Sequence, residues 1–144
     1  REYLELPQDV TTSTREELDA LLEIDGTEDI REVREDLQGL MEQNVGVFRN
    51  EEVLTKALSG IESLWKRHEN IRPETPEDYR ALRELRNMLR VAKVISTSAL
   101  NRQESRGGHN RVDFKDTKEE FRKHTLARIG EDGTVTLTYK TVCT

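Results

Sequence analysis

This 144-residue sequence has one cysteine, few aromatic residues and no long uninterrupted apolar run. Its one cysteine, Cys143, cannot form an intramolecular disulfide, so a reducing compartment is expected and the thiol is read as a spectator. The longest apolar-rich stretch, residues 88–100, is interrupted by Arg90 and Lys93, and a membrane-spanning helix is therefore not expected. No GxGxxG or GxxxxGKS/T loop is present, which argues against a complete nucleotide site within these residues.

The sequence starts at Arg1 without a Met and without the basic and apolar regions of a signal peptide, so we expect a piece of a longer polypeptide. Acidic residues outnumber basic ones by 29 to 23, which does not favour nucleic acid as a partner. Residues 1–60 hold 6 basic and 16 acidic side chains, whereas residues 61–144 hold 17 and 13. This asymmetry often indicates that two halves meet different neighbours, but the interpretation we favour is that the charges cover solvated helix faces.

Hydrophobic residues recur at helical spacing in four segments, which predicts helices at 13–25, 28–44, 51–69 and 77–102. A Ser13-x-x-Glu16 capping box, Thr27 and Asn50 are the expected starts of the first three helices, and Gly26 is the expected end of the first. Residues 70–78 are expected to form a loop, with Pro73 and Pro76 as helix breakers. The fourth helix is apolar over most of its circumference, so it should lie at the centre of a bundle or beneath a larger neighbour.

The composition changes after residue 102. Residues 116–121 are expected to form one helical turn. Alternating residues flank the turn 130–133, which predicts a β-hairpin of residues 125–129 and 134–142. A lone hairpin is marginally stable in water, so it should pack on the helices or on a partner. The predicted fold is mainly α, a bundle of three to four helices with a C-terminal β-hairpin, divided into a linker 1–12, a bundle 13–104 and a loop with hairpin 105–144.

Side chains that could carry chemistry are sparse. The histidines His68, His109 and His124 have no second ligand at zinc-like spacing, so no metal site is predicted. His68 is expected to carry partial positive charge at a helix C-terminus, and Trp65 is expected in the core. Adjacent glutamates on the helices point apart and are read as solvated faces rather than as acid/base pairs. No catalytic residue is predicted.

One polar segment stands out. Its glycines allow unusual backbone conformations, and its arginines offer forked donors for carboxylates and carbonyls. Coming directly after an apolar helix, it could pin the chain to a neighbouring domain, or it could be a capped helix end with surface charges. The candidate contact residues are Arg102, Glu104, Ser105, Arg106, Gly107, Gly108, His109, Arg111 and Asp113.

The run from Glu104 to Asp113 resembles the signature ESRG(A/G)HxRxD of the succinate dehydrogenase/fumarate reductase flavoprotein subunit, in its C-terminal helical domain. Three other stretches are similar to that family in the same order, at residues 37–49, 85–92 and 121–142. Phe121 replaces the usual Trp, and Gly108 stands where Ala is common. The resemblance covers residues 20–142.

The resemblance implies one part of an enzyme. Upstream flavin-binding and capping domains of the same chain would supply the catalytic and dicarboxylate-binding residues, and FAD would be bound there and not by this fragment. Electrons would pass to an iron–sulfur subunit and then to quinone, and an anchor subunit would hold the complex at the inner face of the cell membrane. The isolated fragment, without its neighbours, is expected to be inactive and to self-associate through uncovered apolar surface.

Two alternatives remain open at this stage. L-aspartate oxidase shares the family architecture and resembles residues 85–91 and 104–107, although its tail is not expected to match the Lys123-His124-Thr125 stretch and the hairpin. A stand-alone helical interaction module would show the same amphipathic stripes. An upstream glycine-rich dinucleotide-binding sequence in the same reading frame would separate that module from an enzyme domain.

Overall fold

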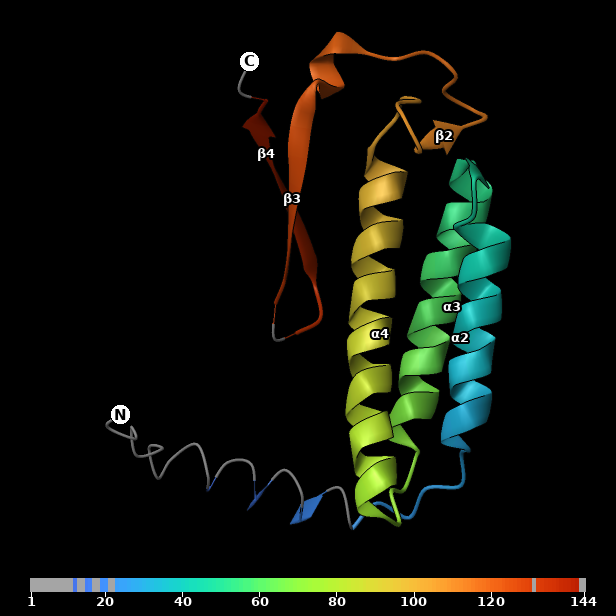
Figure 1. Ribbon diagram of the computed structural model, residues 1–144, viewed down its shortest axis with the longest axis vertical. Coiled ribbons are helices and arrows are strands. Elements are labelled where there is room, and N and C mark those ends of the chain that lie inside the picture. Colours follow the sequence, from blue (N-terminus) through green and yellow to red (C-terminus); the bar gives the residue numbers. More distant parts are fainter. Residues whose placement is uncertain (1–11, 13–14, 17–18, 21–22, 131, 143–144) are drawn as a thin grey trace, which may run out of the picture.

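The computed structural model describes residues 12, 15–16, 19–20, 23–130 and 132–142. Three long helices lie side by side, and a β-hairpin stands next to one of them (Figure 1). The predicted first helix, its Ser13 capping box and Cys143 fall mostly or wholly outside the described residues. The elements are α2 (Ile30–Asn44), β1 (Phe48–Arg49), α3 (Glu51–Glu69), α4 (Pro76–Asn101), β2 (Asn110–Arg111), the 3-10 turn η1 (Glu119–Phe121), β3 (Lys123–Ile129) and β4 (Val135–Thr141).

The start of α2 differs from the prediction. Asp29, not Thr27, is the N-cap: its carboxylate accepts hydrogen bonds from the backbone N–H groups of Arg31 (2.7 Å) and Glu32 (3.4 Å). Gly26 is the predicted end of the first helix, which lies mostly outside the described residues, and the structure shows a further role for it. A Cβ at Gly26 would lie 2.3 Å from the carbonyl oxygen of Asn70, so glycine is needed for this close approach of two backbones.

The other two helices begin close to where the sequence indicates. Asn50 caps α3, as predicted, by accepting from the N–H of Val53 (2.8 Å). Thr75 and Asp78 form a capping box at α4, and Pro76 occupies its first turn. Pro76 therefore begins the helix instead of lying in the loop, because proline fits the first helical position, where its missing N–H costs nothing.

The main core lies between the three helices. Its largest fully buried side chains include Leu37 of α2, Ile61 of α3, and Leu85 and Leu89 of α4, each at most 2% exposed. Burying a side chain of this size stabilises the fold by about 1.5–3 kcal/mol. A second cluster of Val45, Leu54, Ala57 and Ala99 fills the end of the bundle where α4 finishes. Trp65 is half-buried against the main core, which agrees with the sequence-based expectation.

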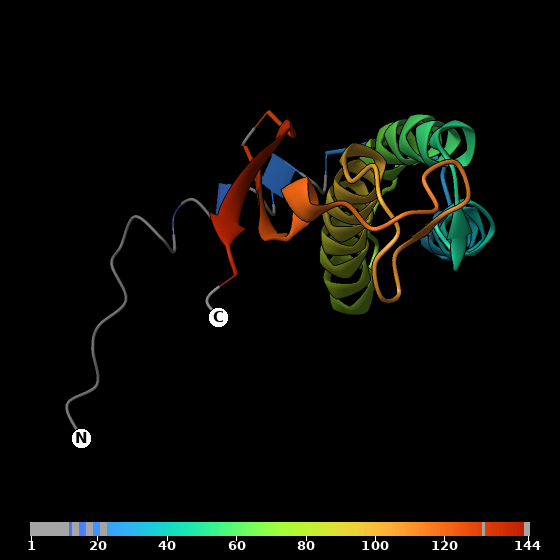
Figure 2. The ribbon, with the colours of Figure 1, turned by 90° about the horizontal axis from the view of Figure 1, so that it is seen from above.

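The C-terminal strands form the predicted hairpin. β3 and β4 are antiparallel over seven pairs, from Lys123 opposite Thr141 to Ile129 opposite Val135. The hairpin packs against α4 on the side away from α2, so α4 has helices on one side and strands on the other (Figures 1 and 2). The mainly α fold with a C-terminal hairpin is therefore confirmed, and α4 lies at its centre. The predicted helical turn at 116–121 is the shorter 3-10 turn η1.

A second pairing was not predicted. β1 and β2 are two-residue strands that pair in parallel, Phe48 with Asn110 and Arg49 with Arg111. They join the α2–α3 connection to the segment after α4, two parts of the chain separated by about sixty residues. In the described part of the chain, no helix combines the length and apolar character that a membrane crossing requires.

Candidate functional site

The signature loop, residues 102–113, closes the end of the bundle where α4 ends and α3 begins (Figure 1). Arg106 and His109 exchange two backbone hydrogen bonds of 2.9 and 3.0 Å, which makes residues 106–109 a tight turn. Gly107 has φ +56°, a conformation that favours glycine at this position. A Cβ at Gly108 would meet nothing within 4 Å, so the fold leaves room for the alanine that is common there.

Glu104 is a fully buried carboxylate at the base of this loop. It accepts hydrogen bonds from the side chains of Arg102 (2.6 Å) and Arg106 (3.0 Å) and from the backbone N–H of Lys118 (2.8 Å). Burial alone would raise the pKa of Glu104, but the Arg106, Lys118 and Arg102 donors outweigh burial and lower the pKa to about 2. Glu104 is therefore ionised at neutral pH and joins the stretch 102–106 to the backbone at Lys118.

Arg111 is the largest fully buried side chain, only 1% exposed. Its Nη1 donates to the carbonyls of Ala99 and Leu100 at 3.0 Å, in the last turn of α4. Its Nε and Nη2 bind the carboxylate of Asp113 at 2.8 Å in a bidentate pair. The guanidinium thus satisfies helix carbonyls that have no partner within the helix.

Asp113 links this pair to the next helix. Its Oδ2 accepts from the backbone N–H of Glu51 (2.9 Å), the first residue of α3. The Arg111 side chain is the largest of the causes that lower the pKa of Asp113 to about 2. A cation therefore lies at the C-terminus of α4 and an anion at the N-terminus of α3, the placement that both helix dipoles favour.

Arg102 ties the loop to the hairpin. Besides Glu104, it donates to the carbonyls of Phe121 and Lys123, both at 2.8 Å, and to Oγ1 of Thr125 at 2.9 Å. Ser105 makes a similar connection within the loop: its Oγ accepts from the N–H of Arg111 at 2.8 Å and donates to the Phe114 carbonyl at 2.9 Å. The bonds from Arg102 to Lys123 and Thr125 fix the position of β3 beside the end of α4.

His109 joins the loop to the α2–α3 connection. Its Nε2 lies 3.0 Å from the Arg102 carbonyl, and its Nδ1 lies 3.2 Å from Nη1 of Arg49. Burial lowers the pKa of His109, and the charges of Arg49 and Arg111 lower it further. The neutral ring fits both contacts, with Nε2–H donating to the carbonyl and Nδ1 accepting from Arg49.

The structure thus brings all nine predicted residues together, in one network that holds α3, α4 and the hairpin. They are not the surface charges of a simple helix end, because Glu104 and Arg111 are buried. Contacts of these residues with other domains stay a prediction. Reasoning from composition did not find that Asp113 binds α3, or that Lys118 and Thr125 take part, since these contacts join separate segments. Arg49 lies within residues 37–49, one of the stretches that carry the resemblance.

The paired glycines of the loop do not have the geometry of a dinucleotide-binding motif. Gly107 and Gly108 follow a helix and close a tight turn, so their backbone does not cradle a diphosphate at the start of a helix. Within the described ranges, no group of three or more potential metal ligands was found. The two carboxylates of the network, Glu104 and Asp113, both have a pKa lowered to about 2 and are held by their arginine partners.

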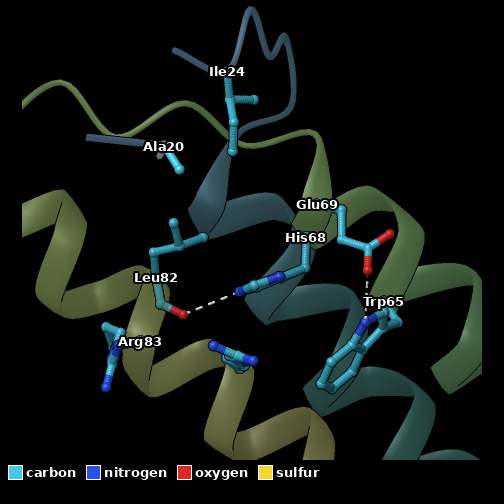
Figure 3. Close-up of a pocket in the computed structure, with 8 residues that line it drawn as sticks. Ala20, Ile24, Trp65, His68, Glu69, Leu82 and Arg83 are labelled. Atoms are coloured by element: carbon cyan, nitrogen blue, oxygen red, sulfur yellow. Dashed lines mark hydrogen bonds between the residues drawn. The ribbon is translucent and has the colours of Figure 1, made fainter. Parts of the chain in front are cut away.

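A separate hollow of about 420 Å³ lies between α3 and the first half of α4 (Figure 3). His68 lines it, with Nε2 3.1 Å from the Leu82 carbonyl, and Nδ1 is a buried atom without a partner among the described residues. Burial is the main cause that lowers the pKa of His68, which favours the neutral ring over the partial positive charge expected from its place at a helix end. Trp65 and Glu69 in the same hollow bond each other at 2.9 Å, and Arg83 and Arg86 also line it.

Comparison with known proteins decides the family. Residues 34–144 match the family model described as fumarate reductase flavoprotein C-term. The chain belongs to this family. A fumarate reductase flavoprotein subunit of Haemophilus influenzae is 34% identical over 131 residues, which cover 87% of this chain and 22% of that protein. An uncharacterized FAD-dependent oxidoreductase of Methanocaldococcus jannaschii is 37% identical over 111 residues, covering 77% and 21%.

Solved structures have the same fold. A variant of the E. coli quinol fumarate reductase FrdA has a TM-score of 0.86 and 30% identity, covering 94% of this chain and 24% of that one. The adenylylsulfate reductase of Archaeoglobus fulgidus has a TM-score of 0.81 at 16% identity, over 99% and 26% of the two chains, which shows the shared fold alone. The chain spans about a fifth of the length of the curated relatives described here. It is therefore the C-terminal helical domain of this flavoprotein family.

Proposed function

We propose that this domain works as part of an FAD-containing flavoprotein subunit that interconverts succinate and fumarate. The observation that carries the proposal is the 34% identity to a fumarate reductase flavoprotein subunit over 87% of the chain. The full-length subunit would hold FAD in an upstream domain, because the Gly107-Gly108 pair of this chain lies in a tight turn after a helix and not in a diphosphate-binding loop. Electrons would pass between the flavin, an iron–sulfur subunit and quinone.

The domain itself would act in assembly, by packing on the flavin-binding domain. The signature loop supports this role, since it fixes the ends of α3 and α4 and the hairpin as one rigid surface. The complex would be peripheral to the inner face of the cell membrane, held there by an anchor subunit. The aspartate oxidase alternative is not favoured, because the family matched and the relatives named above point to fumarate reductase.

The activity is tested on the complete polypeptide that carries this domain. After purification, the flavin content is measured, followed by fumarate-dependent oxidation of a reduced viologen dye and by oxidase activity with L-aspartate. The proposal expects bound flavin and fumarate reduction without aspartate oxidation. Aspartate oxidation without fumarate reduction would overturn it in favour of the alternative enzyme.

The assembly role is tested by Arg106→Ala in the same polypeptide, with Arg128→Ala as the control. Arg106 binds the buried Glu104, whereas Arg128 is an exposed residue of β3. We expect Arg106→Ala to lower flavin retention and yield of the assembled complex, and Arg128→Ala to leave both unchanged. Unchanged assembly and flavin content in the Arg106 variant would contradict the role.

A further inference from the structure

A hollow of about 630 Å³ separates the second half of α4 from the hairpin, and we call it the basic cleft. Its lining contains no Asp or Glu among the described residues. Its floor is apolar, with Val94, Ile95 and Ala99 of α4 facing Ala127 of the hairpin. The cationic residues that line it are Arg49, Arg102, Arg106, Arg122 and Lys123.

Few carboxylates balance these cations. Arg102 and Arg106 share the single buried carboxylate of Glu104. Arg122 pairs with Glu119 at 3.3 Å, but both side chains are more than half exposed, so this pair holds little energy. Lys123 lies over aromatic rings instead, with its Nζ 4.0 Å from the Tyr139 centroid and 5.4 Å from that of Phe121. The cleft therefore presents uncompensated positive charge.

The surface beside the cleft is also uncovered. Ile95 borders both the cleft and an apolar groove between α2 and α4, so the two hollows form one continuous face of α4. On that face Val91 is 57% exposed and Ile95 is 43% exposed, unusual values for large apolar residues in the middle of a long helix. An apolar floor with a cationic rim fits a peptide segment that carries carboxylates around an apolar side chain. A small inorganic anion would pair with the cationic rim but would leave the apolar floor exposed to water.

We propose that the basic cleft holds an acidic segment from the rest of the flavoprotein polypeptide. This inference rests on the proposed function, in which the domain packs on an upstream domain of its own chain. Charge complementarity gives the chemistry of the segment. The length of the relatives indicates where the segment comes from. About four-fifths of each matched relative lies outside the region covered here, so the rest of the same polypeptide can supply it.

Lys123 offers a direct chemical test, and Lys140 provides its control. Thr125 accepts from Arg102 and so faces α4, and Lys123 shares that face because side chains alternate along a strand. Lys140 is opposite His124 in the hairpin and is not among the residues that line the cleft. A lysine ammonium in contact with a carboxylate can be joined to it by a carbodiimide, which forms an amide with loss of water.

The experiment treats the purified full-length flavoprotein with carbodiimide and identifies the linked peptides by mass spectrometry. We expect Lys123 linked to an Asp or Glu outside these 144 residues, and acetic anhydride to modify Lys123 about tenfold more slowly than Lys140. Links from Lys123 only to Glu119, Glu120 or other carboxylates of this domain would overturn the proposal. Links only to a different polypeptide, or equal modification of the two lysines, would overturn it as well.

Charge reversal gives a second measurement on the same protein. Lys123→Glu places like charges against the acidic segment, so protease cleavage between this domain and the rest should accelerate about tenfold, while Lys140→Glu should leave it unchanged. Equal rates in the two variants would contradict the proposal. Fumarate reduction and flavin content of the unmodified protein are recorded in parallel. If fumarate is not reduced but Lys123 is linked as expected, only the enzyme assignment is rejected. If fumarate is reduced but the Lys123 link is missing, only the proposal for the cleft is rejected.

Discussion

Arg111 shows how a charge can be buried without being isolated. All three of its guanidinium nitrogens have acceptors within 3.0 Å, from the last turn of α4 and from Asp113. Burying a charge is costly unless such partners replace water. The residue therefore belongs to the framework of the domain, and its loss should affect folding before it affects chemistry.

Replacing Arg111 by Ala should destabilise the 144-residue chain by about 3–5 kcal/mol, because Asp113 and the carbonyls of α4 would lose their partner. Urea unfolding followed by circular dichroism measures this effect. Arg122→Ala is the control, since Arg122 is exposed and should cost less than about 0.5 kcal/mol. Similar midpoints for the two variants would show that the buried pair adds nothing.

The lowered pKa of Glu104 predicts a defined pH dependence. A carboxylate whose pKa is lower in the folded chain stabilises the fold above its unfolded pKa, and the stabilisation is lost as the pH falls toward about 2. Stability should therefore fall between about pH 5 and pH 2. Glu104→Gln should be less stable than the parent at neutral pH and should show a shallower decrease in acid, measured by urea midpoints across this range. A variant with an unchanged slope would refute the assignment.

At the level of elements, each of the three helices starts at a capping side chain a few residues from the N–H groups it binds, and short sequence patterns describe such caps well. Asn50 caps α3 as expected, and the alternating residues of the C-terminal segment form the hairpin. The error at α2 arose because Thr27 and Asp29 are both good caps two residues apart. Sequence spacing does not decide which of the two side chains reaches the free N–H groups.

The corrected cap can be tested by a pair of substitutions. Asp29→Ala should destabilise the chain by about 1 kcal/mol, because the N–H groups of Arg31 and Glu32 would lose their acceptor. Thr27→Ala should cost less than about 0.5 kcal/mol, since its hydroxyl has only a long 3.4 Å contact with Asn70. Chemical denaturation compares the two variants, and a larger loss at Thr27 would restore the original prediction.

Across the whole molecule, the local elements were predictable and the long-range links were not. The stripes of α2, α3 and α4 follow from the spacing of their apolar residues, and so does the mainly α fold. The parallel pair β1–β2 joins segments sixty residues apart over two residues each, too short to leave a periodic signal. The burial of His68 likewise depends on α4 packing over the end of α3, so its neutral ring could not be read from its position at a helix end.

We propose that this chain acts as a holding domain of a flavoprotein and that the flavin is bound elsewhere in the complete polypeptide. The most direct measurement compares the visible absorption of two purified proteins after incubation with FAD and gel filtration: the 144-residue chain and the complete polypeptide that contains it. The account predicts flavin absorbance with the complete polypeptide and none above background with the 144-residue chain. Stoichiometric flavin retained by the 144-residue chain would contradict it.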